Sequence, residues 1–388
     1  MGEVYGDKDM AVKKKVLIVN DMIQGGGVEK LMYDLVWHWH DKYDISVMTY
    51  GYYTEGETTF PVNVCYISAS VKKEYNSNIL IKQLDKVRRK IYGKYFEWKL
   101  NRMGYDMVIA IKDGWIMQKV SQMKIPVKYG WIHTDYNNYY YTQGIFGTAE
   151  KEYECMKGFR KIVCVAESVR QGIIDVIGDP GNLVVKYNPI NVEDILEKAI
   201  EPVVDIPDTP VPGIPRFVTV GRLNHQKGYD LLLEACHMLE KEGLEFEVLI
   251  VGGEEPWGDE HNQLYRAHKR LGLKKVKFIG GRKNPYKYMR CADWFLSSSI
   301  FEGFSLVSQE AAILDVPLIL TDCSGVRELL GDSEYGIVMG ISVLDIYRNM
   351  KRVITHPELH EYYKKKIMER KLTICFEERI KEIEELFL

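Results

Sequence analysis

Two cations lie five residues apart in the segment GRLNHQKG, residues 221–228: Arg222 and Lys227. This segment directly follows the apolar run 216–221 and directly precedes a helical pattern that starts near residue 228. A loop between a strand and a helix brings cationic side chains beside the free N–H groups of the helix N-terminus, and such a place binds anions. The residues therefore predict a diphosphate site.

A second loop, SSSIFEGFSLVSQEAA at residues 297–312, also joins a predicted strand to a predicted helix. It contains Glu302 and Glu310, with seven residues between them, and Gly303, which lets the backbone approach a ligand closely. The N–H groups of the following residues would open the helix as an anion cradle. The residues predicted to line this cradle are Gly303, Phe304, Ser305, Leu306 and Val307. One site is thus expected to hold phosphate and hydroxyl groups together.

These loops require parallel sheets, because open parallel α/β sheets bind ligands beyond the carboxyl ends of their strands. The run KVLIVN, residues 15–20, predicts a first buried strand, and short apolar runs then alternate with helical periodicity as far as residue 187. Five prolines between 202 and 215 exclude a continuous helix or a central strand there, so we predict the domain connection between residues 189 and 215. The same alternation restarts at 216–221. The pattern predicts a doubly wound α/β fold in two successive units.

Length and composition indicate a soluble, globular protein of two domains. A chain of 388 residues is too long for one ordinary core. The net charge of -3 favours no nucleic-acid partner. Seven cysteines without any CxxC pair suggest neither a disulfide framework nor a zinc site, and no signal segment or apolar run of about 18 residues is found. We therefore expect a cytoplasmic protein.

The two loops together resemble a known family. The G-R-L…K-G segment and the Glu-x7-Glu element are similar to those of the retaining, metal-independent "glycosyl transferases group 1" family, which is glycosyltransferase family 4-like. This resemblance implies the GT-B architecture, with two Rossmann-like domains facing across a cleft and a C-terminal helix that crosses back. The implied limits are 1–190 for an acceptor domain, joined by 372–388, and 191–371 for a nucleotide-sugar domain.

The resemblance also implies roles for the donor side. Arg222 and Lys227 would bind the donor diphosphate and stabilise its charge as it leaves, which removes the need for a metal or another cofactor. Glu302 would accept hydrogen bonds from sugar hydroxyls, and Glu310 would hold the ribose diol. The donor would be a nucleotide sugar, which we expect to be linked to UDP.

Three further segments match the family's pattern. Gly281 and Arg282, in the segment FIGGRK, fall at the base-binding position. Gly26 and Gly27 match a glycine loop that approaches the donor phosphate. A glycine-rich turn after a strand is common in Rossmann-like proteins, but the spacing here departs from the GxGxxG of dehydrogenases. His133, in WIHTD, matches a histidine near the reacting face of the sugar, and a partly buried structural histidine is the alternative.

The acceptor side is defined less well. Asp135 and Tyr139 belong to an aromatic segment, residues 135–146, that either binds a glycan or lipid-linked acceptor or only packs a loop. The basic amphipathic run 79–102 is compatible with peripheral contact at the inner membrane surface and equally with a solvated helix face. The alternative to an enzyme is a non-catalytic GT-B partner subunit. The base, the sugar, the acceptor and the linkage stay open.

Overall fold

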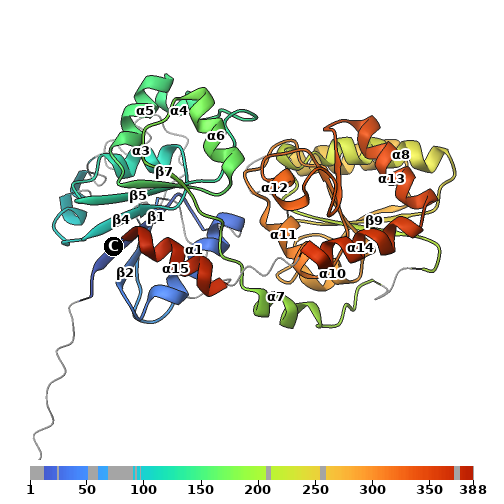
Figure 1. Cartoon of the computed structure of the whole chain (residues 1–388), viewed down its shortest axis with the longest axis horizontal. Coiled ribbons are helices and arrows are strands. Elements are labelled where there is room, and N and C mark those ends of the chain that lie inside the picture. Colours follow the sequence, from blue (N-terminus) through green and yellow to red (C-terminus); the bar gives the residue numbers. More distant parts are fainter. Residues whose placement is uncertain are drawn as a thin grey trace, which may run out of the picture. The chain divides into compact units, whose positions relative to one another are not determined.

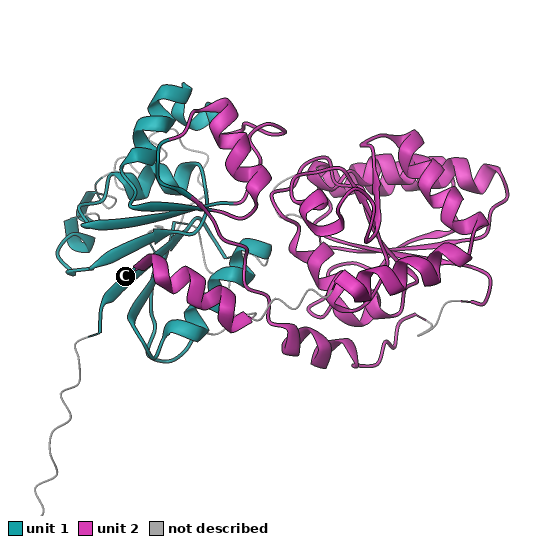
Figure 2. Ribbon diagram, in the orientation of Figure 1, with its two compact units in different colours: residues 1–132, 142–163, 180–183 teal, residues 133–141, 164–179, 184–388 magenta. Residues whose placement is uncertain are grey.

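The computed structural model describes residues 13–23, 26–50, 60–68, 91, 94–96, 98–206, 211–253, 259–370 and 376–387. By internal contacts the chain divides into two compact units (Figure 2). Unit 1 comprises residues 1–132, 142–163 and 180–183, and unit 2 comprises residues 133–141, 164–179 and 184–388. The domain limits taken from the sequence, near 190 and 371, stay predictions.

The first sheet has seven strands in the order β3-β2-β1-β4-β5-β6-β7 (Figure 1). β1 pairs in parallel with β2 on one side and with β4 on the other. The strands are β1 (Lys15–Asn20), β2 (Asp44–Thr49), β3 (Cys65–Ser68), β4 (Met107–Ala110), β5 (Val127–Ile132), β6 (Lys161–Cys164) and β7 (Leu183–Val185). The helices along this part of the chain are α1 (Gly27–Trp39), α3 (Trp115–Ser121), α4 (Gln143–Phe146), α5 (Ala149–Lys157) and α6 (Glu167–Val176).

The second sheet has six strands in the order β10-β9-β8-β11-β12-β13. They are β8 (Arg216–Val220), β9 (Glu247–Val251), β10 (Val276–Phe278), β11 (Trp294–Ser297), β12 (Leu318–Thr321) and β13 (Ile337–Met339). Every neighbouring pair in this sheet is parallel. The helices are α7 (Val192–Ala199), η1 (His225–Lys227), α8 (Tyr229–Lys241), α9 (Glu260–Leu271), α10 (Tyr286–Arg290), α11 (Leu306–Ile313), α12 (Val326–Leu330), α13 (Val343–Thr355), α14 (Glu358–Arg370), α15 (Phe376–Glu384) and η2 (Glu385–Phe387). The predicted α/β class is confirmed.

Helices cover both faces of the second sheet because its strands are apolar on both sides. Phe217 packs into a core with α8, α9 and α13, whereas its neighbour Val218 packs into a separate core with α7, α10 and α11. Phe295 and Leu296 on β11 divide between the two cores in the same way. Successive side chains of a strand point to opposite faces, so an unbroken apolar run requires cover on both. Figure 1 shows α8 and α13 on one side of β9, with α10 and α14 on the other.

The connection that we predicted between residues 189 and 215 contains one helix that the sequence analysis did not foresee. α7 occupies Val192–Ala199, before the first of the five prolines, and the side chain of Asn191 caps it by accepting from the N–H of Asp194 at 3.0 Å. The excluded continuous helix is indeed absent from the described part of 189–215, because α7 ends before Pro202. The prolines therefore exclude a continuous helix between residues 202 and 215, but they leave room for α7 before it.

The charged, helical C-terminal stretch of the sequence carries apolar residues, and three of them are buried, whereas Phe376 and Leu386 are partly buried. Ile380, Ile383 and Phe387 are inaccessible to solvent or nearly so, whereas Leu372 and Ile374 lie outside the described residues. α15 packs on the segment that follows β7: Arg379 donates to the carbonyl oxygen of Asn188, and Lys186 Nζ lies 3.1 Å from a carboxylate oxygen of Glu382. Both contacts lie within unit 2.

The turn before α8 depends on a glycine. Gly228 has φ +58°, and a Cβ at this position would lie 2.1 Å from the carbonyl oxygen of Ser298. Gly243, at the end of α8, has a similar φ of +75°, but a Cβ there would meet no other atom within 4 Å. The two positions share the left-handed backbone and differ in the space around it.

We expect Gly228→Ala to destabilise the protein more than Gly243→Ala does. The left-handed conformation costs an alanine about 1 kcal/mol at either position, whereas the overlap with Ser298 at position 228 should add at least ~2 kcal/mol. Urea and thermal unfolding of both variants beside the wild type measure this difference. Equal losses of stability would contradict the close packing of the two loops.

Candidate active site

The candidate site lies at the point where the chain reverses its direction across the second sheet. From β8 the chain proceeds outward to β9 and β10, and then returns to β11 on the other side of β8. β8 and β11 are neighbours, with Phe217 opposite Trp294. Loops that leave two such strands in opposite directions open a crevice at their carboxyl ends, which is the usual ligand position in open α/β sheets. The two loops singled out from the sequence follow these two strands.

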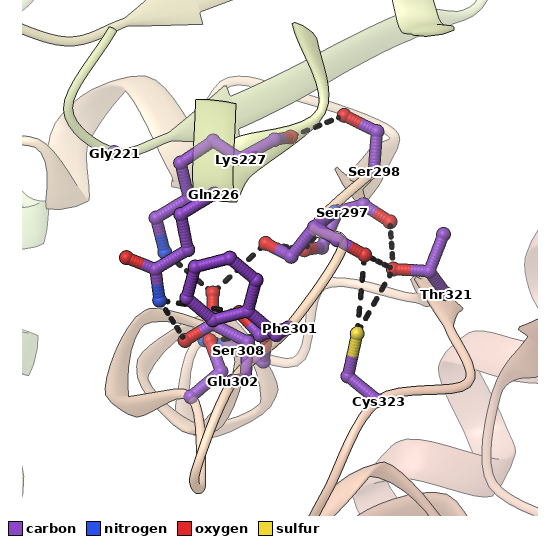
Figure 3. A network of polar contacts seen from close by, with 12 residues as sticks. Gly221, Gln226, Lys227, Ser297, Ser298, Phe301, Glu302, Ser308, Thr321 and Cys323 are labelled. Carbon is purple, nitrogen blue, oxygen red and sulfur yellow. Dashed lines mark hydrogen bonds and ion pairs between the residues drawn. The ribbon is translucent and has the colours of Figure 1, made fainter. Parts of the chain in front are cut away.

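An ion pair joins the two loops. Lys227 Nζ donates to Glu302 Oε1 at 2.6 Å (Figure 3), and both side chains are largely buried, with 15% and 11% of their surface exposed. Lys227 ends the short η1 turn, and Glu302 follows β11 by five residues. The fold therefore brings together two of the residues that the sequence predicted to act on one ligand.

The same carboxylate is held by two side chains that the sequence analysis missed. Ser299 Oγ donates to Glu302 Oε1 at 2.8 Å, and Gln226 Nε2 lies 3.5 Å from Glu302 Oε2. Gln226 Nε2 also donates to the carbonyl oxygen of Phe301 at 3.1 Å. Thr321, at the end of β12, donates to the carbonyl oxygen of Ser299 at 2.6 Å and fixes that turn. The serine run 297–299 directly after an apolar strand was the available sequence signal.

Arg222 lies on the same loop as Lys227, and its side chain is exposed. The neighbouring Leu223 is buried and its N–H donates to the carbonyl oxygen of Gly253 at 3.0 Å, which anchors the start of the loop. The loop therefore carries one exposed cation and one largely buried cation.

The N-terminus of α11 carries the predicted anion cradle. Ser305 caps this helix, since its Oγ accepts from the N–H of Ser308 at 3.4 Å. Glu310, one turn into α11, is buried with 4% exposure and accepts from the hydroxyl of Tyr286 at 3.2 Å. Gly303 is required by packing, because a Cβ there would lie 1.9 Å from the carbonyl oxygen of His133. The remaining members of the cradle, Phe304, Leu306 and Val307, are partly buried.

Glycines allow the strand ends on the other side of β8 to pack backbone against backbone. A Cβ on Gly252 would lie 2.0 Å from the carbonyl oxygen of Gly221, and a Cβ on Gly281 would lie 3.2 Å from the Cα of Gly253. The N–H of Gly252 donates to the carbonyl oxygen of Gly280 at 3.1 Å. The sequence analysis named Gly281 but missed the pair 252–253, although two glycines directly after the buried strand 247–251 gave a signal.

Arg282 is held by an acidic residue of the connecting segment. Its Nη2 lies 2.7 Å from Asp205 Oδ2, and its Nε donates to the hydroxyl of Tyr288 at 3.0 Å. Tyr288 also contacts Asp205, at 2.9 Å. The hydrogen bond from Arg282 lowers the pKa of the Asp205 carboxyl. Asp205 had no signal in the sequence, because the contact joins residues 77 positions apart.

The loop after β5 contains the three predicted acceptor-side residues. His133 is partly buried, and its carbonyl group packs on Gly303 as described above. Asp135 is 5% exposed, and its oxygens accept from the N–H of Asn137 at 3.0 Å and from Asn138 Nδ2 at 2.6 Å. Burial raises the pKa of this carboxyl above its usual range. Asp135 therefore fixes the start of the loop.

Tyr139 stacks on Phe301, the residue before Glu302. The ring centroids are 4.2 Å apart and the planes are inclined by 21°. Tyr141 stacks on Tyr139 in turn, with centroids 5.6 Å apart. The tyrosine-rich loop thus lies beside the Lys227–Glu302 pair within unit 2, and Phe301 is a contact that the sequence did not reveal.

Gly26 and Gly27 belong to unit 1 and form the N-terminus of α1, directly after β1. A Cβ on Gly26 would lie 2.6 Å from Glu29 Oε2, and the carbonyl oxygen of Gly26 accepts from the N–H of Lys30. At the same edge of the first sheet, Lys112 Nζ lies 2.6 Å from Asp21 Oδ2. Residues 24 and 25 of the predicted glycine loop lie outside the described residues.

Among the residues that the structure describes, no group of three or more His, Cys, Asp and Glu side chains is arranged to hold a metal ion. Within the same residues, no helix combines the length and the apolar character needed to span a bilayer.

Solved structures define the class of fold. The chain is similar to Alr3699/HepE of Anabaena, solved with UDP and glucose, with a TM-score of 0.71 and 16% identity over 96% of this chain and 99% of that chain. Sucrose-phosphate synthase from Thermosynechococcus elongatus gives a TM-score of 0.75 and 15% identity over 97% and 98%. The protein therefore has the GT-B fold.

The part of the chain that contains the candidate site matches a known family. Residues 209–370 match the model of the family "Glycosyl transferases group 1", and this part of the chain belongs to that family. The predicted resemblance to the group 1 family is confirmed for these residues, and the retaining, family 4-like part of the prediction stays a prediction.

Curated relatives match over parts of their length. An N-acetylgalactosamine-N,N'-diacetylbacillosaminyl-diphospho-undecaprenol 4-alpha-N-acetylgalactosaminyltransferase of Campylobacter jejuni is 34% identical over 195 residues, which are 49% of each protein. The lipopolysaccharide core biosynthesis mannosyltransferase LpsB of Rhizobium meliloti is 28% identical over 31% of this chain and 35% of its own. The chain thus matches about half or less of the length of these relatives.

The Lys227–Glu302 pair predicts a measurable coupling in stability. Removing one charge leaves the other largely buried and uncompensated, so Lys227→Met and Glu302→Gln should each lower the free energy of unfolding, and the double variant should lose less than their sum. We expect a coupling of about 1–3 kcal/mol, measured by urea unfolding of all four proteins. Effects that add to within ~0.5 kcal/mol would show that the pair contributes nothing.

Proposed function

We propose that the protein is a glycosyltransferase that moves a hexose or N-acetylhexosamine from a nucleotide sugar to a glycan or lipid-linked acceptor in bacterial polysaccharide or glycoconjugate synthesis. The observation that carries the proposal is the Lys227–Glu302 pair at the switch point of the second sheet. It puts a cation and a carboxylate side by side, and a nucleotide sugar presents phosphate oxygens beside sugar hydroxyls in the same way. The match of residues 209–370 to the group 1 family supports it.

On the donor side, Lys227 and Arg222 bind the diphosphate. The phosphate charge grows as the bond to the anomeric carbon breaks, so fixed cations stabilise the transition state more than the ground state. N–H groups at the N-terminus of α11 add to the same field. Glu302, held by Ser299, accepts from sugar hydroxyls.

The ribose and the base of the donor are bound beyond the diphosphate. Glu310 accepts from the ribose diol, and its hydrogen bond from Tyr286 fixes the carboxylate for this role. The flat glycine surface at Gly253 and Gly281 accommodates the base, with Arg282 beside it. A uracil base is our preferred assignment, and the donor screen described below tests it. Gly26 and Gly27, at the N-terminus of α1, are assigned to the donor phosphate through the resemblance alone.

On the acceptor side, we assign His133 to the reacting face of the sugar and Tyr139 to acceptor binding. The Tyr139–Phe301 stack supports this assignment, because it places the loop next to Glu302. Asp135 contributes by ordering that loop. In the proposed reaction the acceptor hydroxyl oxygen bonds to the anomeric carbon and its proton passes to the departing phosphate oxygen, the nucleoside diphosphate leaves with the bonding electron pair, and the configuration is retained.

The central test is a screen of UDP-, GDP- and dTDP-sugars for donor hydrolysis and transfer. One nucleotide sugar should be turned over, and NMR of the product should show the anomeric configuration of the donor. Lys227→Ala should lower turnover by at least about 100-fold, the size expected for one transition-state charge contact, without unfolding the protein.

Lys274→Ala is the matched control, since this exposed lysine lies on the loop before β10 and should leave turnover unchanged. A folded protein that binds no nucleotide sugar, and yet binds a glycan or another glycosyltransferase, would instead indicate a non-catalytic partner subunit.

We further propose that transfer needs no metal, because Arg222 and Lys227 supply the positive charge at the phosphates. Turnover in 5 mM EDTA, about the usual chelating concentration, should equal turnover in Mg²⁺ or Mn²⁺. Strong inhibition by EDTA that added Mg²⁺ reverses would overturn this part of the proposal and leave the transferase assignment intact.

A further inference from the structure

The helical segment between residues 91 and 102 in unit 1 is apolar on two sides. Phe96 and Leu100, four residues apart, are buried in the unit. Ile91, Tyr95 and Trp98 are large apolar side chains on the opposite side, and 65%, 56% and 50% of their surfaces are exposed. An ordinary surface helix buries its apolar stripe and presents polar residues outward. This segment departs from that pattern, so its outer side requires an explanation.

The exposed side chains form one stripe. Residues 91, 95 and 98 follow one another at intervals of four and three, which is the spacing of a single helix face, and Arg102 lies in the turn after the helical residues 98–100. We call Ile91, Tyr95, Trp98 and Arg102 the outward stripe. Tyr95 and Trp98 stack with ring centroids 5.9 Å apart, and the Arg102 guanidinium carbon lies 4.2 Å from the centroid of the Trp98 ring. The rings are therefore ordered by each other rather than by a core.

Positive charge surrounds the outward stripe. Lys94 and Lys99 flank it and are both exposed, and Arg102 ends it. The sequence of residues 79–102 contains eight Lys and Arg but only Asp85 and Glu97 as acids, in a chain whose net charge is -3. The positive charge is therefore local, and it belongs to the same segment as the exposed rings.

The C-terminal end of the segment is tied to a neighbouring surface of similar chemistry. Asn101 Oδ1 accepts from the N–H of Lys124 at 3.1 Å, and Leu100 and Asn101 line a shallow hollow with Tyr50 and Lys119. Next to that hollow, the partly exposed Trp115 packs edge-on against Tyr50. Lys119 Nζ lies 5.9 Å from the centroid of the Trp115 ring. Aromatic rings and cations thus continue beyond the stripe itself.

We propose that the outward stripe and its flanking lysines bind the surface of an anionic lipid bilayer. Tyr and Trp favour the level of the lipid headgroups, where the ring is in an apolar layer and its polar atom is hydrated. Lys and Arg extend from there to lipid phosphates. A protein partner would supply its own acidic side chains, whereas the exposed rings and cations of this face lie side by side, as the headgroup layer of an anionic bilayer requires. The inference concerns a surface of unit 1 and is independent of the donor site in unit 2.

Vesicle flotation tests the proposal with the full-length protein. Vesicles of phosphatidylcholine alone and vesicles with about 30% phosphatidylglycerol serve as the probes, because only the second carry surface charge. Binding should require the anionic lipid and should weaken as salt is raised from 0.05 to about 0.5 M, since screening shortens the range of the attraction. Lys94→Glu with Lys99→Glu should weaken binding at least about 25-fold, from ~1 kcal/mol for each lysine.

The matched control reverses two exposed lysines of unit 2, Lys241→Glu with Lys269→Glu, and changes the net charge by the same amount. It should bind anionic vesicles nearly as well as the wild type. If both double variants weakened vesicle binding equally, binding would depend on net charge alone, and the proposal would be overturned. Equal binding to both kinds of vesicle would overturn the proposal as well. Binding to neither kind would also overturn it and would favour a protein partner.

A second measurement locates the contact without relying on the stability of the charge variants. Lipids brominated on the acyl chains quench the fluorescence of nearby indole rings. Quenching by anionic brominated vesicles should be largely lost in Trp98→Phe, which keeps an apolar ring. It should persist in Trp37→Phe, which removes another half-exposed indole from α1 of the same unit. Unchanged quenching in Trp98→Phe, with binding retained, would place the contact elsewhere and refute the assignment.

Discussion

The close backbone contact between two loops at the switch point of the second sheet supports the rest of the candidate site. Gly228 packs on the carbonyl group of Ser298, and Ser298 Oγ donates to the carbonyl oxygen of Lys227 at 2.8 Å. Only this approach lets Lys227 reach Glu302 from a neighbouring loop. The ion pair is thus a consequence of backbone packing, and the packing is possible because β8 and β11 are parallel neighbours whose connections run in opposite directions.

Glycine has the same physical role at several strand ends. At Gly221 and Gly252 two backbones approach more closely than a side chain on residue 252 would permit, and Gly253 and Gly281 also pack backbone against backbone. Gly303 allows a comparable contact with His133. A site for a large polar ligand needs exposed N–H and carbonyl groups and a shallow floor, and glycines provide both. The charged side chains then act above a surface that is mostly backbone.

The candidate donor site and the proposed lipid-binding surface are held in place by different kinds of contact. In the donor site, polar groups are held by hydrogen bonds and partial burial, as for Glu302 with Ser299 and Lys227. On the outward stripe, Tyr95, Trp98 and Arg102 are ordered mainly by one another. The first arrangement suits a defined small ligand and the second suits a soft, variable surface. The two proposals therefore concern two different kinds of surface.

The sequence by itself determined the α/β class and the two loops of the candidate site. Apolar runs followed by glycines and charged residues are local signals, and parallel strands always bring their carboxyl ends to one edge of the sheet. The tertiary structure alone decided which residues meet: Glu302 with Ser299 and Gln226, Phe301 with Tyr139, and Arg282 with Asp205. It also showed that Asp135 is engaged in its own loop and that Trp98 faces outward. The contacts of Glu302 with Gln226, of Phe301 with Tyr139 and of Arg282 with Asp205 join distant parts of the chain, and their energies depend on packing that no local pattern encodes.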